Sequence, residues 1–308
     1  MLVSPDVTDV LSPPVPSRPR VPSTTGAGIV LAACGVLMFS LSLPMTKIAL
    51  RSMSPAFTAM GRAVIAGTLG AISLVATKTP LPTRAQIGRL LFVVAGVIFG
   101  WPLLLAYALH RVPSNHGAIV TGLLPLATAG FAVALAGERP SVRYWLCSVA
   151  GLVAVCAYAL RSGGGSLHLA DLLLILAVIA SALGYAEGAK LARQMSGWRV
   201  ISWALVLALP ITIPAAIATS GGIENATIGQ LGAFAYIGVV SMFLGFFAWY
   251  AGLARAGIAR GGQIQLAQPV LSLLWAWPLL GERPDLAGFL TAAVVIAAVA
   301  IGRTSAIR

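Results

Sequence analysis

An arginine inside an apolar segment is the first residue of this chain that could do chemistry. Arg62 lies about eight residues into the run 54–77, roughly 12 Å from its start if the run is a helix rising about 1.5 Å per residue. A charge at that depth is costly and marks function or pairing. We interpret the guanidinium as a candidate ligand for a substrate carboxylate. The alternative is that Arg62 snorkels outward or packs against helix-end carbonyls.

Two amides and two prolines form a second group of candidate residues. Gln265 and Gln268 are three positions apart and share one face of a helix. Unpaired amides in hydrocarbon are costly, so both must face water or protein; a water-filled cavity is favoured over hydrogen bonds between helices. Pro269 frees a backbone carbonyl one turn earlier, and Pro125 does so in the first half of the chain. Both prolines are therefore candidates for helix breaks and gating.

Glu187 is interpreted as the only carboxylate within the body of an apolar helix. A carboxylate there could carry a proton and couple the protein to a proton gradient. Lys190, three residues further on, could instead pair with it across one helical turn. The ion pair is the favoured interpretation, and proton coupling is the alternative.

Two aromatic side chains, Tyr107 and Trp275, are further candidates for a substrate pathway. They could stack on a planar substrate or shape a cavity. Lipid-facing or packing roles are equally open for each.

Residues at the ends of segments are expected to be structural. Glu138 and Glu282 stand at helix ends and should hold turns. His110 and His116 flank one connection, where a solvated interfacial position is favoured over lining the mouth of a pathway. No further ligand lies nearby in sequence, so no metal site is expected, and nothing indicates a cofactor.

The composition is that of an all-α integral membrane protein. Hydrophobic residues make up 58% of the chain and charged residues only 9%, against about 25% charged in a soluble domain. The stretches 26–46, 117–137 and 201–222 carry no charge and are long enough to cross a bilayer. The lipid bilayer is therefore an expected partner. Nucleic acid is not expected, because the net charge of +12 comes from connections between apolar runs.

Ten transmembrane helices are expected, with connections too short to hold a soluble domain. Their approximate ranges are 26–47, 54–77, 88–110, 115–137, 143–160, 170–190, 199–219, 229–253, 262–280 and 286–303. Residues 1–25 are rich in proline and contain no long apolar run, which predicts a disordered cytoplasmic tail.

Lys and Arg are distributed unequally between the two sides of such a bundle. The side that holds the N-terminus carries fourteen: Arg18, Arg20, Lys78, Arg84, Arg89, Arg139, Arg143, Lys190, Arg193, Arg199, Arg255, Arg260, Arg303 and Arg308. The other side carries five: Lys47, Arg51, Arg111, Arg161 and Arg283. The bias places both termini in the cytoplasm, and a bacterial inner membrane is the expected location.

The chain contains an internal repeat with an offset of 144 residues. Pro125 then aligns with Pro269, and Gly-Glu-Arg-Pro at 137–140 aligns with the same four residues at 281–284. The two repeats are expected at 26–161 and 168–303. Each holds five helices, an odd number, so the second is inverted relative to the first. Inverted repeats around a central cavity are typical of secondary transporters.

The chain resembles the EamA-type members of the drug/metabolite transporter superfamily. The resemblance rests on two five-helix halves, each with a proline thirteen positions before the glutamate of Gly-Glu-Arg-Pro, together with Lys47 and Arg62. It implies export or exchange of amino acids and related small metabolites through a central cavity.

Transport is therefore the expected function, as efflux of a small-molecule substrate by alternating access. An enzyme is not expected, because no hydrolase elbow, His-Glu-x-x-His pair or nucleotide-binding loop is found. An intramembrane enzyme and a non-transporting scaffold or receptor remain the alternatives. Gly96-x-x-x-Gly100 indicates close helix packing, either within the chain or in a homodimer.

Overall fold

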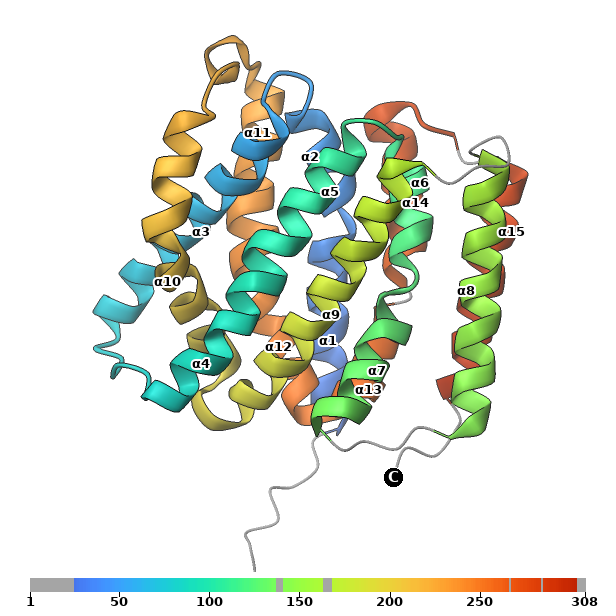
Figure 1. Cartoon of the computed structure of the whole chain (residues 1–308), viewed down its shortest axis with the longest axis horizontal. Helices are drawn as coiled ribbons and strands as arrows, with labels where there is room; N and C mark the ends of the chain where they lie inside the picture. The colour runs from blue at the N-terminus through green and yellow to red at the C-terminus, as the bar shows by residue number, and fades with distance from the viewer. Residues whose placement is uncertain (1–24, 137–140, 163–167, 266, 284, 304–308) are drawn as a thin grey trace, which may run out of the picture.

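The described part of the chain is a bundle of helices. The computed structural model describes residues 25–136, 141–162, 168–265, 267–283 and 285–303, and within these ranges it contains no strand. Figure 1 shows the helices running side by side along one common direction, with α8 and α15 paired along one side of the bundle.

The helices have the following bounds in chain order. They are α1 Thr25–Ser40, α2 Ser42–Ala49, α3 Pro55–Ala76, α4 Arg84–Val93, η1 Val94–Gly100, α5 Trp101–Leu109, α6 Ser114–Thr121, α7 Leu124–Ala136, α8 Val142–Ser162, α9 Leu169–Met195, α10 Gly197–Ala218, η2 Ile223–Asn225, α11 Ile228–Tyr236, η3 Ile237–Leu244, α12 Gly245–Ala256, α13 Ile258–Ile264, α14 Ala267–Leu280 and α15 Leu286–Arg303.

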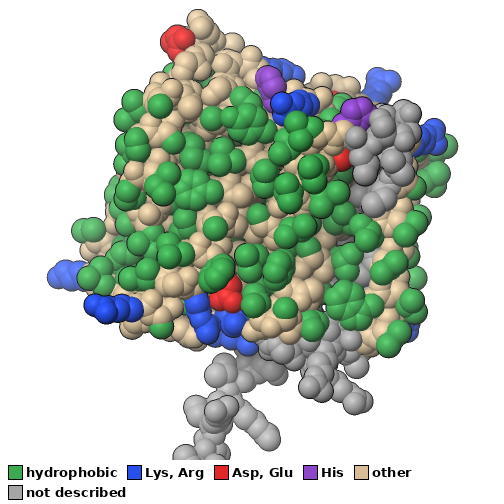
Figure 2. Space-filling model, in the orientation of Figure 1, with side chains coloured by type: hydrophobic (Ala, Val, Ile, Leu, Met, Phe, Trp, Pro, Cys, Tyr) green, Lys and Arg blue, Asp and Glu red, His purple; other side chains and the backbone are tan. Residues whose placement is uncertain are grey.

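Seven helical stretches in the described ranges are long and apolar enough to cross a membrane. They are Gly26–Ala49, Pro55–Ala76, Arg84–Leu109, Ser114–Leu135, Leu169–Met195, Gly197–Ala218 and Ile228–Ala256. On the face shown in Figure 2, hydrophobic side chains cover the middle of the molecule, while charged and histidine side chains gather toward its two ends. This distribution is the one that a bilayer requires of a multi-pass membrane protein.

Two of the helical rods are interrupted close to a proline. The first break separates α6 from α7, where Gly122 N–H donates to Ile119 O in a tight turn. Pro125 is the second residue of α7, and Pro269 is the third residue of α14, after the break that follows α13. Proline is tolerated in the first turn of a helix because its missing N–H would have had no partner there.

The rods α4–η1–α5 and α11–η3–α12 share two local features. Each begins with a capping box, formed by Thr83 with Gln86 in one and by Thr227 with Gln230 in the other. Each then contains a π-helical segment, η1 or η3. Both pairs of features are separated by about 144 residues, the offset of the internal repeat. The correspondence therefore extends to backbone geometry.

Small residues bring the helices into close contact. α3 packs on α10, α1 on α12, and α8 on α15. Gly96 and Gly100 both face Ala180 of α9, and Gly67 of α3 faces Leu209 of α10. Of the two interpretations of the Gly96-x-x-x-Gly100 motif, the structure shows packing within the chain. These glycines are therefore not available to a dimer face.

Replacing Gly96 by alanine is expected to destabilise the bundle. The added methyl carbon would lie 2.2 Å from the backbone oxygen of Ala180, and a backbone atom cannot turn aside as a side chain can. Forced separation of packed helices costs about 1–3 kcal/mol, which should lower the unfolding temperature of the purified protein in detergent.

The matched control is Gly88→Ala on the same rod, where an added methyl group would have no neighbour within 4 Å. It should leave the unfolding temperature unchanged or raise it, because alanine favours helix over glycine by up to about 1 kcal/mol. Equal unfolding temperatures for the two variants would contradict the close contact.

Candidate functional site

Arg62 lies in the interior of the bundle. Its residue surface is 3% exposed, so it does not snorkel outward in this structure. Its Nη2 donates to Ser241 Oγ of η3 at 3.1 Å, and Ser241 Oγ lies 2.5 Å from Ser42 Oγ of α2. Its Nε has no hydrogen-bond partner, and none of the ion pairs in the described part of the chain includes it. Arg62 is thus a buried cation with unused hydrogen-bonding capacity.

A small closed cavity surrounds this guanidinium. Its volume is about 10 Å³, room for about one water molecule. Side chains from both halves of the chain line it, including Ser42, Trp101, Tyr185, Phe246 and Gln268. The lining therefore combines polar groups with aromatic rings, and the cavity is too small to hold a metabolite in this conformation.

The two candidate amides lie next to this cavity. Gln265 and Gln268 are 1% and 2% exposed. Gln265 Nε2 donates to Gln268 Oε1 at 3.3 Å and, at 3.5 Å, to the Tyr185 hydroxyl of α9. Gln265 Oε1 has no partner. Gln268 shares the cavity with Arg62, while Gln265 also makes the interhelix hydrogen bond that sequence analysis had ranked second.

The two candidate aromatic residues lie apart from the cavity lining. Tyr107 of α5 is 41% exposed. The Trp275 indole N–H donates to Ser40 Oγ at 3.0 Å, which ties α14 to α1. For both residues the structure agrees with the alternative roles, facing outward for Tyr107 and packing for Trp275.

Glu187 is paired with Lys190 in α9. Lys190 Nζ lies 3.3 Å from Glu187 Oε1 and donates to Leu135 O at 2.8 Å. Glu187 Oε2 is buried and has no partner. Glu187 lies in the body of α9, and a second buried carboxylate, Asp171, lies in the first turn of the same helix.

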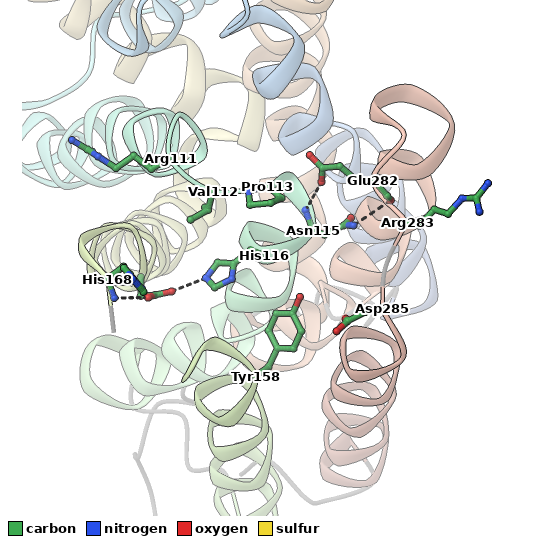
Figure 3. A pocket seen from close by; sticks show the side chains of 11 residues that line it. Arg111, Val112, Pro113, Asn115, His116, Tyr158, His168, Glu282, Arg283 and Asp285 are labelled. Atoms are coloured by element: carbon green, nitrogen blue, oxygen red, sulfur yellow. Dashed lines mark hydrogen bonds and ion pairs between the residues drawn. The ribbon is translucent and has the colours of Figure 1, made fainter. Parts of the chain in front are cut away.

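A larger cleft opens near the ends of α6, α8, α9 and α15, with a volume of about 560 Å³ (Figure 3). His116 of α6 and Asp171 of α9 line it, with Nε2 and Oδ1 only 2.6 Å apart. They are 8% and 3% exposed. The expectation of a solvated histidine is therefore wrong for His116, and it holds for His110, which is exposed.

Glu282 closes another side of this cleft by capping α6. Its two carboxylate oxygens accept from the backbone N–H groups of Ser114 at 3.1 Å and Asn115 at 2.9 Å. A carboxylate at a helix N-terminus satisfies free donors and complements the helix dipole. The expected structural role is confirmed for Glu282, whereas Glu138 lies outside the described residues.

Sequence reasoning missed Ser42, Ser241 and the partner of His116. Serine is common in membrane helices, so type alone does not single out either one. The internal repeat offered one signal for Ser241. At the 144-residue offset Ser241 aligns with the apolar Val97, so a polar residue stands in one half where the other half has an apolar one, and both residues line the Arg62 cavity. Asp171 is 55 residues from His116, and no local pattern connects them.

The fold and the placement of charge define a multi-pass membrane protein with charged side chains toward its two ends and a few buried polar groups, Arg62 among them, in its interior. Two segments of the sequence, residues 26–160 and 168–302, match the EamA-like transporter family. The chain belongs to the EamA-like transporter family. Membership indicates a transporter rather than an enzyme.

Individual relatives agree with this assignment. The chain is 42% identical to a Bacillus subtilis protein named uncharacterized transporter YdeK, over 91% of this chain and 98% of the relative. It is 22% identical to a probable terminal-alkyne amino-acid exporter of Streptantibioticus cattleyicolor, over 86% and 89% of the two chains. A crystal structure with 18% identity shares the fold, with a TM-score of 0.69 over 90% of this chain and 96% of the other.

Glu282→Gln is expected to lower stability, because the amide brings only one acceptor and no charge to the start of α6. Loss of a charged cap costs about 0.5–2 kcal/mol, measurable by thermal unfolding in detergent. The neighbouring Arg283→Gln serves as control, since Arg283 is exposed and lies over the Trp277 ring. Wild-type stability in Glu282→Gln would rule out the capping role.

Proposed function

We propose that this protein is a secondary transporter that exports small carboxylate-bearing metabolites, with amino acids as the leading class, by alternating access. The observation that carries the proposal is Arg62, a buried guanidinium with an unpartnered Nε and no ion pair among the described residues. An unpaired buried charge is costly. A substrate carboxylate would supply the missing acceptors in a strong charge-assisted pair.

Alternating access would come from ten spans in two inverted repeats of five. The matched capping boxes, π-helical segments and helix breaks support this arrangement. In Figure 1, α4 and α7 lie toward one end of the bundle, while α11 and α14, their equivalents under the repeat offset, lie toward the other. Two halves of opposite direction can exchange conformations and so open a shared central site to each side in turn.

The closed space around Arg62 must widen before it can hold a metabolite. The breaks before Pro125 and Pro269 are suitable hinges, because the backbone hydrogen-bond ladder is already interrupted there. The π-helical segments contribute Val97, Ser241 and Met242 to the same space, and such segments are frequent at functional sites. Movement at these points would change the size of the cavity without unfolding a helix.

The proposed function includes an orientation of the protein in the membrane and a direction of transport. The excess of Lys and Arg on one side supports an orientation with both termini in the cytoplasm, and the proposed location is a bacterial inner membrane. The exposed cleft between α6 and α9 then faces outward. Export is supported by the printed name of the amino-acid exporter among the relatives. A small-molecule substrate and the surrounding lipid are the partners that this function needs.

Arg62→Ala is expected to reduce transport about tenfold or more, because a hydrogen bond to a charged group contributes about 1.5–3 kcal/mol. The measurement is uptake of a labelled panel of amino acids and other metabolites into proteoliposomes. Arg84→Ala is the control, since Arg84 is an exposed arginine at the start of α4. Gel filtration and thermal unfolding show whether Arg62→Ala still folds.

Gln268→Leu provides a second test at the same cavity, because it removes a polar lining group without removing the buried charge. It should also reduce transport. Folded wild-type protein that moves no solute in either direction would contradict transport. Undiminished flux in folded Arg62→Ala would instead remove Arg62 from the pathway.

Glu187→Gln separates the two roles considered for Glu187. Because Glu187 pairs with Lys190, the substitution should lower stability by about 1–3 kcal/mol and leave the response of transport to an imposed proton gradient intact. Flux measured with and without the gradient checks this. Loss of the gradient response in folded Glu187→Gln would show that Glu187 carries the coupled proton.

A further inference from the structure

The His116–Asp171 pair joins the two repeats at one end of the bundle. His116 comes from α6 in the first half and Asp171 from α9 in the second. Asp171 is held in place by a second contact, since the His168 backbone N–H donates to its Oδ2 at 2.8 Å. The His116 ring lies 6.0 Å from the Tyr158 ring of α8. Two groups able to exchange protons are therefore fixed together, beside a cleft.

Glu282, Asp285, Arg111 and Arg283 around the cleft already have partners or point elsewhere, and His168 forms a capping box with Asp171 at the start of α9. Glu282 is occupied by the N-terminus of α6 and also faces Lys47 of α2. Asp285 Oδ1 accepts from Gly288 N–H at 2.8 Å. Arg111 Nη1 donates to Tyr107 O, and Figure 3 shows Arg111 and Arg283 pointing away from His116. Asp171 Oδ1 is the partner of the imidazole, at 2.6 Å from His116 Nε2.

The pair has no counterpart in the other half of the chain. With the 144-residue offset His116 aligns with Arg260, and with the 143-residue offset that aligns Lys47 with Lys190, Asp171 aligns with Gly28. The Gly-Glu-Arg-Pro turns, by contrast, occur in both halves. Structural needs common to both repeats therefore do not explain the pair. It makes one end of a duplicated protein chemically different from the other.

We propose that His116 and Asp171 form a proton-binding site that latches the two halves at the outer mouth. We assign the hydrogen of the 2.6 Å contact to His116 Nε2, because the Asp171 carboxylate already accepts at Oδ2 and offers Oδ1 as a second acceptor. This leaves Nδ1 to take up one proton from external water. The product is an imidazolium–aspartate pair, with one additional positive charge and a stronger hydrogen bond. Protonation holds the outer mouth closed, and deprotonation loosens it.

A role of this latch in coupling proton binding to transport rests on the proposed transport function. Because the cleft faces outward in the proposed orientation, external pH would set the state of the latch. Histidine is suited to this task, since it is the side chain that ordinarily changes charge between about pH 5 and 8. The latch lies at the opposite end of α9 from Glu187 and Lys190, so the two candidate proton sites can be tested separately.

Proton binding can be measured directly, because the chain has only three histidines. Protein labelled at histidine with 13C and 15N, in nanodiscs, would be titrated by NMR between about pH 5 and 8. Single substitutions of His110, His116 and His168 by glutamine assign the signals. The His116 signals should show a proton on both ring nitrogens at the acidic end of the series and on Nε2 alone at the basic end. This change should differ in Asp171→Asn and be the same in His110→Gln. Signals of His116 that do not change with pH overturn the proposal.

Movement of the latch can be followed without a substrate. Spin labels at Leu169→Cys of α9 and Leu286→Cys of α15, both exposed, span the cleft in protein whose three native cysteines are replaced by serine. Glu282 binds the α14–α15 connection to the start of α6. The label at Leu286, just after this connection, should therefore follow movement of α6 relative to α9. The distance should be shorter at acidic pH. A distance that does not change with pH, or that still changes in His116→Gln, overturns the latch.

Proteoliposome flux then tests coupling. Wild type and His110→Gln should respond to an imposed proton gradient, while His116→Gln should exchange substrate but lose that response. An undiminished response in His116→Gln overturns coupling through this pair. If wild type moves no solute at all, the transport function fails, and the NMR and distance measurements alone decide the proton-binding latch.

Discussion

Close contact between helix backbones is the constraint on which the rest of this structure depends. In hydrocarbon, helices gain little from burying apolar surface, so they associate through packing of small residues and a few polar contacts. Methyl groups added at Gly28 and Gly252 would approach backbone nitrogens of α12 and α1 at 2.9 Å and 2.6 Å. The α1–α12 contact and the contact of Gly96 with α9 hold together segments from different repeats.

This packing determines where polar groups can lie. A bundle closed by glycine contacts leaves little internal space, and Arg62 with its serine partners occupies part of what remains. Other charged side chains lie at helix ends, where they bind the backbone N–H and C=O groups that have no partner within the helix. Glu282 satisfies the start of α6, and Lys47 donates to Leu109 O and Val112 O beyond the end of α5. Arg62 therefore remains in the interior as a cation without an ion pair among the described residues.

Sequence reasoning found the helices because apolar runs of membrane-spanning length leave few alternatives. It also found that Arg62 lies deep within a helix, since depth follows from distance along a single helix, but it expected single helical spans where the structure has α6 and α7, and α13 and α14. It could not choose faces for Tyr107 or Trp275, because segments that are apolar all round give no amphipathic signal. It could not see the Arg62–Ser241 contact, which joins residues 179 positions apart, and it misjudged His116 for the same reason.

The two π-helical segments bear on the evolutionary origin of the molecule. A π turn adds a residue to a helix without breaking it and is rare as a chance event. Here one lies at Val94–Gly100 and another at Ile237–Leu244, at equivalent places in two halves whose sequences have otherwise diverged widely. The simplest account is that the extra residue was already present in the single ancestral gene, before it was doubled. The side chains of Arg62, His116 and Asp171, by contrast, each occur in one half of the chain only, so the two halves share the wide turn of the backbone but not these polar side chains.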